Sequence, residues 1–199
     1  MGAHMENWRL FTGIREKVVR AARHLPLVIL FLSCGCLVTG EGGGIPHLEV
    51  TSGAFAAGGQ IPVAYTCDGE NITPALAWGP VPAGTASVAI LVTDTDAPGG
   101  TFTHWVVYNL PPGLQGIPAR GPGRAALPAG AVEGTNDMGR TGYTGPCPPG
   151  GKPHHYHFTV SALDTTLNLT GRQDGRMLAG AMAGHVLARG EIVGIYQRA

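Results

Sequence analysis

Charged side chains are scarce in this chain of 199 residues: 13% are Asp, Glu, Lys or Arg, and 13 basic residues balance 13 acidic ones. Five of the basic residues precede Cys36, so the remainder holds eight basic and eleven acidic residues, a formal charge of −3. Proteins that bind nucleic acid through its phosphates need clustered Lys and Arg. The composition therefore argues against nucleic acid as a partner.

Long uninterrupted segments are also missing. The chain contains 32 glycines and 16 prolines, which interrupt helices and set special backbone angles at bends. The longest apolar run is shorter than the roughly 20 residues that a helix needs to cross a bilayer. Apolar residues make up 44% of the chain, enough for one buried core. These features exclude an all-helical fold and favour a single domain of short strands.

The N-terminus has the order of an export signal. A basic stretch to Arg23 precedes an apolar run over residues 25–32, and Cys34 and Cys36 follow directly. A cysteine in this place, before a glycine-rich segment, resembles the signal of a bacterial lipoprotein. We therefore expect lipid on Cys36, or alternatively on Cys34, to hold the protein at the membrane.

This interpretation divides the chain into three parts. Residues 1–36 are expected to be a leader, residues 37–47 a flexible linker and residues 48–199 the folded domain. The domain would then be exported and anchored to the cell envelope, on its periplasmic or outer surface. Secretion without lipid and an uncleaved membrane anchor are the two alternatives that the same signal leaves open.

Beyond the leader, short runs rich in β-branched and aromatic residues alternate with Gly/Pro turns, which is typical of strands. One helix is predicted between Thr170 and Arg189, where apolar residues recur near helical spacing and Gly190 supplies a stop. Residues 115–134 have little periodicity and predict an irregular surface loop. Strands are predicted at residues 48–51, 62–65, 75–78, 87–94, 104–110, 155–163 and 191–197.

Three of these strands carry a polar residue at one end of an apolar face, because alternate side chains of a strand share a face. If these ends meet, they form a concave site with an apolar wall and convergent polar groups, as in many small-ligand pockets. The alternative is that each is a hydrogen-bonded polar residue at a strand end. The expected faces are Val88, Ile90, Val92 and Asp94; His104, Val106 and Tyr108; and His154, Tyr156, Phe158 and Val160.

Several short motifs surround these residues in a fixed order. Their order and spacing resemble the phosphatidylethanolamine-binding protein family, especially its bacterial, Raf-kinase-inhibitor-like branch. The resemblance runs from about Leu48 to Gln197, which is nearly the whole expected domain. The motifs are YTCDGENITP at residues 65–74, TDTDAPGG at 93–100, FTHW at 102–105, GPCPP at 145–149 and HHY at 154–156.

The resemblance implies a mainly β fold of two antiparallel sheets, Greek-key and sandwich-like, with one or two short peripheral helices. It also implies a surface pocket for an anion such as phosphate or a phospholipid headgroup, in a protein that is not an enzyme and needs no cofactor or metal. Thr95 replaces the usual Pro of the motif, and Cys147 stands where eukaryotic members often carry Gly. The residues that match the family's pocket are Asp94, Pro98, His104, Gly145, Pro148, His154 and Tyr156.

The chemistry of these residue types suits an anion. Two imidazoles and a phenol supply donors, and Gly145 would let backbone N–H groups approach an oxyanion closely. We expect Asp94 to orient a histidine, or to receive the ammonium end of a zwitterionic headgroup. Asp96 matches the second acid of the motif and is expected to brace its loop by accepting backbone N–H bonds.

Two cysteines, Cys67 and Cys147, remain in the expected domain after the leader. Export would put them in an oxidising compartment, where paired cysteines tend to form disulfides. We therefore predict that the two are close and joined, which would link an early loop to the expected pocket. The alternative is that they are two separate small apolar residues.

Three other functions compete with anion binding. His155 and His157 share a face at a spacing that two metal ligands can have, but no carboxylate or cysteine stands at the close spacing of familiar zinc motifs. A hydrolase would use His154 or His104 as base and Asp94 as its orienter, but no Gly-x-Ser-x-Gly motif supplies a nucleophile. A module that regulates a protein partner, as a kinase or protease inhibitor does, is the third, and the sequence names no partner.

Overall fold

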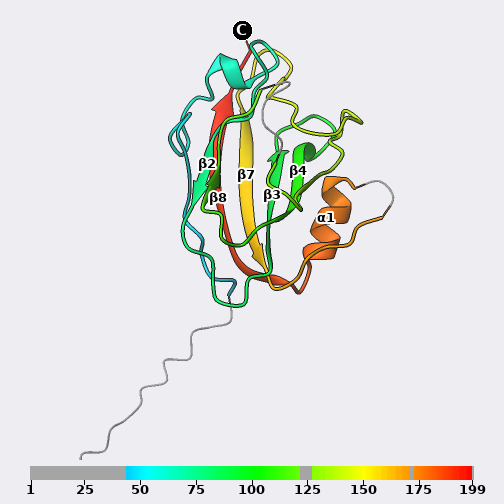
Figure 1. Ribbon diagram of the computed structural model, residues 1–199. Helices are drawn as coiled ribbons and strands as arrows, with labels where there is room; N and C mark the ends of the chain where they lie inside the picture. Colours follow the sequence, from blue (N-terminus) through cyan, green and yellow to red (C-terminus); the bar gives the residue numbers. More distant parts are fainter. Residues whose placement is uncertain (1–43, 122–126, 171–172, 199) are drawn as a thin grey trace, which may run out of the picture. The chain divides into compact units, whose positions relative to one another are not determined.

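The computed structural model in Figure 1 describes residues 44–121, 127–170 and 173–198. The predicted leader, with Cys34 and Cys36, lies outside these residues. Within them, no helix is long and apolar enough to span a membrane. All strand pairs in the two sheets are antiparallel, so the predicted mainly β fold with two antiparallel sheets is confirmed.

The larger sheet has five strands and the smaller sheet has three. The larger one follows the order β6-β4-β3-β7-β8, and the smaller one follows the order β1-β2-β5. Their strands are β1 (Val50–Ser52), β2 (Leu76–Trp78), β3 (Ser87–Asp94), β4 (Phe102–Leu110), β5 (Gly116–Ile117), β6 (Val132–Glu133), β7 (His154–Leu163) and β8 (Val186–Tyr196).

Strand β3 lies in the middle of the larger sheet, and apolar groups cover it on both faces. Its inner face carries Ile90 and packs with Phe158 and residues of the smaller sheet in the main core. Its outer face carries Ala89, which packs with Leu178 of helix α1 (Gly175–Met182) in a second, smaller cluster. Figure 1 shows α1 against this outer face. Burial on both faces explains why the sequence of β3 is a nearly continuous apolar run.

The strand predicted at residues 62–65 was wrong. These residues contain a short 3₁₀ helix, η1 (Val63–Tyr65), with the amide of Tyr65 donating to the carbonyl of Pro62 at 3.0 Å. Val63 is 53% exposed, so its β-branched side chain is not part of a sheet face. Pro62 has no N–H for a strand ladder but suits the start of a helical turn.

The predicted helix is real but shorter than expected. Asp174 caps its start by accepting from the amide of Met177 at 2.9 Å, and the helix ends at Met182, just before Gly184 with its positive φ of 83°. Gly190 is therefore not the stop. It lies inside β8, where a side chain would overlap the carbonyl oxygen of Leu48.

The stretch at residues 115–134 is less irregular than predicted. It contains β5, which pairs with β2, and β6, which pairs with β4 at the edge of the larger sheet. Each of these strands has only two residues. A two-residue strand is too short to produce a periodic pattern, so no pattern indicates either strand.

Candidate functional site

A β-bulge in β4 determines where His104 points. Val92 of β3 pairs with Trp105, and the next residue, Thr93, pairs with Thr103, so His104 is an extra residue in the ladder. The His104 ring consequently lies on the inner side with Trp105, and its centroid is 5.2 Å from that of Tyr156 in an edge-on contact. Bulges redirect side chains in this way beside functional sites.

The face predicted for His104 is therefore wrong beyond that residue. Val106 and Tyr108 lie on the outer face, where they pack in the cluster beneath α1. The faces predicted for the other two strands agree with the structure. The apolar residues of both faces lie in the main core, and Asp94 pairs directly with Tyr156 across β3 and β7.

The polar ends of these strands border a pocket of about 490 Å³, which we call the inner pocket. Five of the seven residues that were predicted to bind ligand line it, and they come from β3, β4, β7 and the loops beside them. The full lining is Cys67, Asn71, Asp94, Ala97, Pro98, Phe102, His104, Met138, Arg140, Thr144, Cys147, Pro148, Pro149 and His154.

Asp94 and His154 form a buried pair on this wall. The ring Nδ1 of His154 lies 2.7 Å from Oδ2 of Asp94, and the two residues are 6% and 4% exposed. The other carboxylate oxygen accepts the backbone N–H of Asp96 at 2.8 Å. An ionised carboxylate can only accept, so Nδ1 carries the proton and Nε2 is left for other contacts. Asp94 thus orients His154, one of the two roles expected for it.

His104 is held by a backbone carbonyl. Its Nδ1 lies 2.7 Å from the oxygen of Thr144, so this nitrogen donates and Nε2 remains outside that bond. Burial lowers the pKa of His104, and the Thr144 carbonyl and the charges of Asp94 and Asp137 only partly oppose this effect. The neutral ring is therefore favoured in the free protein, and a bound anion would favour its protonation.

Gly145 and Tyr156 lie behind the wall. The amide of Gly145 donates to Oδ1 of Asn71 at 2.7 Å, so it is already used by the protein. A Cβ at Gly145 would come within 2.8 Å of Thr66 Cα, which explains why glycine is needed there. The hydroxyl of Tyr156 is buried and has no partner in hydrogen-bond geometry among the described residues. Burial, followed by the charge of Asp94, raises the pKa of Tyr156.

A disulfide forms one edge of the inner pocket. Cys67 and Cys147 are bonded, with their Cα atoms 5.4 Å apart, as the sequence predicted. The two loops are also joined by hydrogen bonds, from the amide of Cys67 to the carbonyl of Pro146 at 3.1 Å and from the Tyr143 hydroxyl to Tyr65 O at 2.9 Å. The early loop and the pocket loop thus act as one wall.

The sequence analysis missed two residues of this site. Arg140 lies on the pocket wall, and its guanidinium forms no ion pair within the described residues. Asn136 is fully buried beneath the same loop. Its amide donates to Gly142 O and Thr144 Oγ1, each at 2.9 Å, and its oxygen accepts the amides of Met138 and Arg140. The Asn-Asp-x-Gly sequence at 136–139 is a turn signal that could have drawn attention to this loop.

The other predicted polar residues lie outside the pocket. Asp96 accepts both the backbone N–H of His155 at 2.8 Å and its ring Nδ1 at 2.7 Å, and these bonds lower the pKa of Asp96. This geometry fits the expected bracing role. His157 pairs with Glu191 at 3.2 Å instead of sharing a ligand with His155. Among the described residues, no group of three His, Cys, Asp or Glu side chains is arranged to hold a metal ion.

Comparison with known proteins agrees with this architecture. The family model described as "Phosphatidylethanolamine-binding protein" matches residues 51–197. The UPF0098 protein of Methanothermobacter thermautotrophicus is 44% identical, over 76% of this chain and 99% of that protein. LppC of Mycobacterium tuberculosis, which is named as a candidate lipoprotein, is 40% identical over 75% of this chain and 71% of its own length.

A solved structure is also similar. The crystal structure of Escherichia coli YbcL, described as a new member of the mammalian PEBP family, superimposes with a TM-score of 0.72 at 37% identity. The match covers 77% of this chain and 99% of YbcL. The matched region of the family model includes every wall residue of the inner pocket. By its sequence and its fold, this chain belongs to the phosphatidylethanolamine-binding protein family.

Proposed function

We propose that this protein binds small anionic or phosphate-bearing ligands, such as a phospholipid headgroup, in the inner pocket and does not catalyse a reaction. One observation carries the proposal: His104, His154 and Arg140 line the same pocket. Imidazolium and guanidinium groups bind phosphate oxygens strongly, through charge-assisted hydrogen bonds. The nearby carboxylate of Asp94 is already engaged with His154 and its own loop.

The polar groups of the pocket are held in place before any ligand arrives. Asp94 fixes the His154 ring, and the Thr144 carbonyl fixes the His104 ring. Fixed donors lose little conformational freedom when a ligand binds, so more of the interaction energy appears as affinity. In both rings Nε2 takes no part in these bonds, and a protonated Nε2 can donate to a phosphate oxygen.

Among the described residues that line the inner pocket, no side chain is suited to be the nucleophile of a hydrolase. The two cysteines there are joined in the disulfide, and the hydroxyl of Thr144 is tied to the Asn136 amide at 2.9 Å. Nε2 of His154 could serve as a base, because Asp94 holds Nδ1 of that ring, but a base alone does not supply the nucleophile of a covalent mechanism. Binding without chemistry is the simpler use of these groups.

We also propose that lipid on Cys36, or else on Cys34, anchors the domain outside the cytoplasmic membrane. The order of basic, apolar and cysteine residues supports this, as does the similarity to LppC. Mass spectrometry of the protein from its native membrane should find an N-terminal, lipid-modified cysteine. An intact N-terminus beginning with Met1 would contradict the proposal.

Calorimetric titration of the full-length protein with O-phosphorylethanolamine tests the binding function. His104→Ala and His154→Ala should each lose about 1.5 to 3 kcal/mol of binding free energy, the usual size of a hydrogen bond to a charged group. Arg189→Gln serves as the control, because Arg189 is a cation on β8 that lines neither this pocket nor the one beside α1. No binding by the parent, or unchanged affinity in both histidine variants, would refute the proposal, and turnover of the probe would favour the hydrolase.

A further inference from the structure

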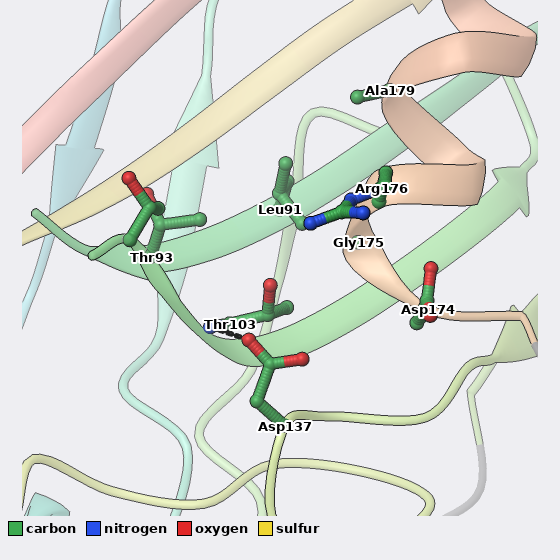
Figure 2. A pocket seen from close by; sticks show the side chains of 9 residues that line it. Leu91, Thr93, Thr103, Asp137, Asp174, Gly175, Arg176 and Ala179 are labelled. Atoms are coloured by element: carbon green, nitrogen blue, oxygen red, sulfur yellow. Dashed lines mark hydrogen bonds between the residues drawn. The ribbon is translucent and has the colours of Figure 1, made fainter. Parts of the chain in front are cut away.

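The larger sheet has a second pocket, on its outer face. This outer pocket has a volume of about 500 Å³ and lies between β3, β4 and the first turn of α1 (Figure 2). Thr93, Thr103 and Asp137 line it, and each directly precedes a residue that lines the inner pocket. Successive residues of a strand point to opposite faces, so β3 and β4 each contribute to both pockets.

One wall of the outer pocket offers hydrogen-bond donors without partners. Thr103 is only 7% exposed, and its hydroxyl has no hydrogen bond among the described residues. Arg176, in the first turn of α1, lines the same pocket (Figure 2), and its guanidinium forms no ion pair in the described part of the chain. Both groups border the pocket, so a ligand in it could form hydrogen bonds to them.

The helix start adds two further donors. The backbone N–H groups of Gly175 and Arg176 make no hydrogen bond within the described residues, as is usual for the first turn of a helix. Gly175 allows the helix to approach β4 closely, because a Cβ there would lie 2.5 Å from Oγ1 of Thr103. The helix start and the Thr103 hydroxyl thus lie together, and they suit one carboxylate group.

Two carboxylates also border the outer pocket, Asp137 beside Thr103 and Asp174 at the start of α1. Asp137 accepts the backbone N–H of Thr103 through Oδ2 at 2.7 Å, and this bond, drawn in Figure 2, fixes the carboxylate at the pocket edge. Asp174 also lines the pocket while it caps α1. Two carboxylates would repel a purely anionic ligand such as phosphate, but they would attract an ammonium group.

We propose that the outer pocket binds a zwitterionic small molecule of the α-amino acid class. Its carboxylate would bind to Arg176, the Thr103 hydroxyl and the first amides of α1, and its ammonium group would bind to Asp137. The apolar side chain of Leu91 faces the same space, which favours a small aliphatic side chain on the ligand. This site uses none of the side chains that line the inner pocket and does not depend on the function proposed for it.

NMR titration of the full-length protein with L-valine tests the proposal. We expect saturable shifts of the Thr103 and Gly175 amides, and binding at least about tenfold weaker for L-valinamide, which lacks the carboxylate, and for N-acetyl-L-valine, which lacks the ammonium group. Inorganic phosphate should not displace L-valine.

Two variants complete this test, with the remaining amide signals as the check on folding. Arg176→Gln and Asp137→Asn should each weaken L-valine binding at least about tenfold, whereas Arg140→Gln at the inner pocket should leave it unchanged. No saturable shift in the parent, equal binding of the three compounds, or unchanged affinity in either outer-pocket variant would overturn the proposal.

Discussion

Each face of the larger sheet borders one pocket, and the two pockets are similar in size. The polar groups of the two pockets are held differently. In the inner pocket, Asp94, His104 and His154 each have a short bond to another part of the protein. In the outer pocket, the Thr103 hydroxyl and the Arg176 guanidinium have no such bond among the described residues. The inner pocket is therefore preorganised, whereas a ligand of the outer pocket must order part of its own site. We expect the outer pocket to bind more weakly for this reason.

Removing the disulfide should give the largest effect and should affect the two pockets unequally. A Cys67→Ser, Cys147→Ser double variant removes a crosslink between residues 80 positions apart. We expect the free energy of unfolding to fall by about 2 to 4 kcal/mol, mainly because the unfolded chain becomes less constrained. Denaturant unfolding measures this loss.

The same variant should also lose most of its O-phosphorylethanolamine binding, because both cysteines line the inner pocket. L-valine binding at the outer pocket, which the disulfide does not touch, is the control and should persist in the folded variant. Stability equal to that of the parent would contradict the structural role of the crosslink.

Asn136→Ala should have the next largest effect. The substitution removes one buried amide that makes four hydrogen bonds and shapes the loop carrying Arg140. We expect a loss of about 1 to 3 kcal/mol in the free energy of unfolding, the usual penalty for leaving buried groups without partners. Binding at the inner pocket should weaken as well, because Thr144 and Arg140 lose their support. Calorimetry with O-phosphorylethanolamine measures this affinity, and an unchanged value would contradict a role of the loop in the site.

Two glycines of α1 form a matched pair on the outer face. Gly175→Ala should destabilise the protein by about 1 to 2 kcal/mol, because the added methyl group would clash with the Thr103 side chain. Gly180→Ala, in the same helix, meets no atom within 4 Å and should stabilise the protein by about 0.5 to 1 kcal/mol. Thermal unfolding of both variants gives the comparison. Shifts of the same sign would contradict the close packing at the helix start.

The smallest expected effect is a pH dependence that only the inner pocket should show. Burial lowers the pKa of His104 in the folded protein below 6.5, so the unfolded state binds more protons between these two values. The resulting stability is fully present above about pH 6.5 and is lost as the pH falls toward the folded pKa, with a slope of at most about 1.4 kcal/mol per pH unit. The pKa values of Asp68 and Asp96 are also lowered, but from 3.8, so these two groups change the stability only in more acidic solution.

His104→Gln should remove this dependence, and Arg176→Gln should retain it. Urea unfolding at a series of pH values between 5 and 8 measures it. An identical pH profile for the parent and His104→Gln would contradict a shifted His104 pKa.

Much of the site was predictable because strands have a period of two. The alternation of side chains predicts that Asp94 and Tyr156 each lie on the apolar face of their own strand. The structure pairs the two residues directly. The bulge at His104 was not predictable, because it depends on which residues of β3 and β4 pair, and pairing is a property of the assembled sheet. The face assigned to Val106 and Tyr108 was wrong for this reason.

The roles of loop residues were harder to predict than their places. Gly145 matched the motif, but its amide is used by Asn71, 74 positions away, and no local pattern signals that bond. The backbone of Arg140 is held by Asn136, whose side-chain oxygen accepts the Arg140 amide. The outer pocket combines two strands, a loop and the start of α1, so it depends on tertiary packing alone.

The central claim is that the histidines of the inner pocket bind an anion, and NMR titration of the imidazole rings tests it most directly. Ring signals of His104 and His154 would be followed against pH in the full-length protein, with and without O-phosphorylethanolamine. The account predicts that the probe raises the pKa of at least one ring, because a phosphate favours the charged imidazolium, and that affinity falls as the pH rises through the pKa of the bound state. Unchanged titration of both rings at saturating probe would contradict it.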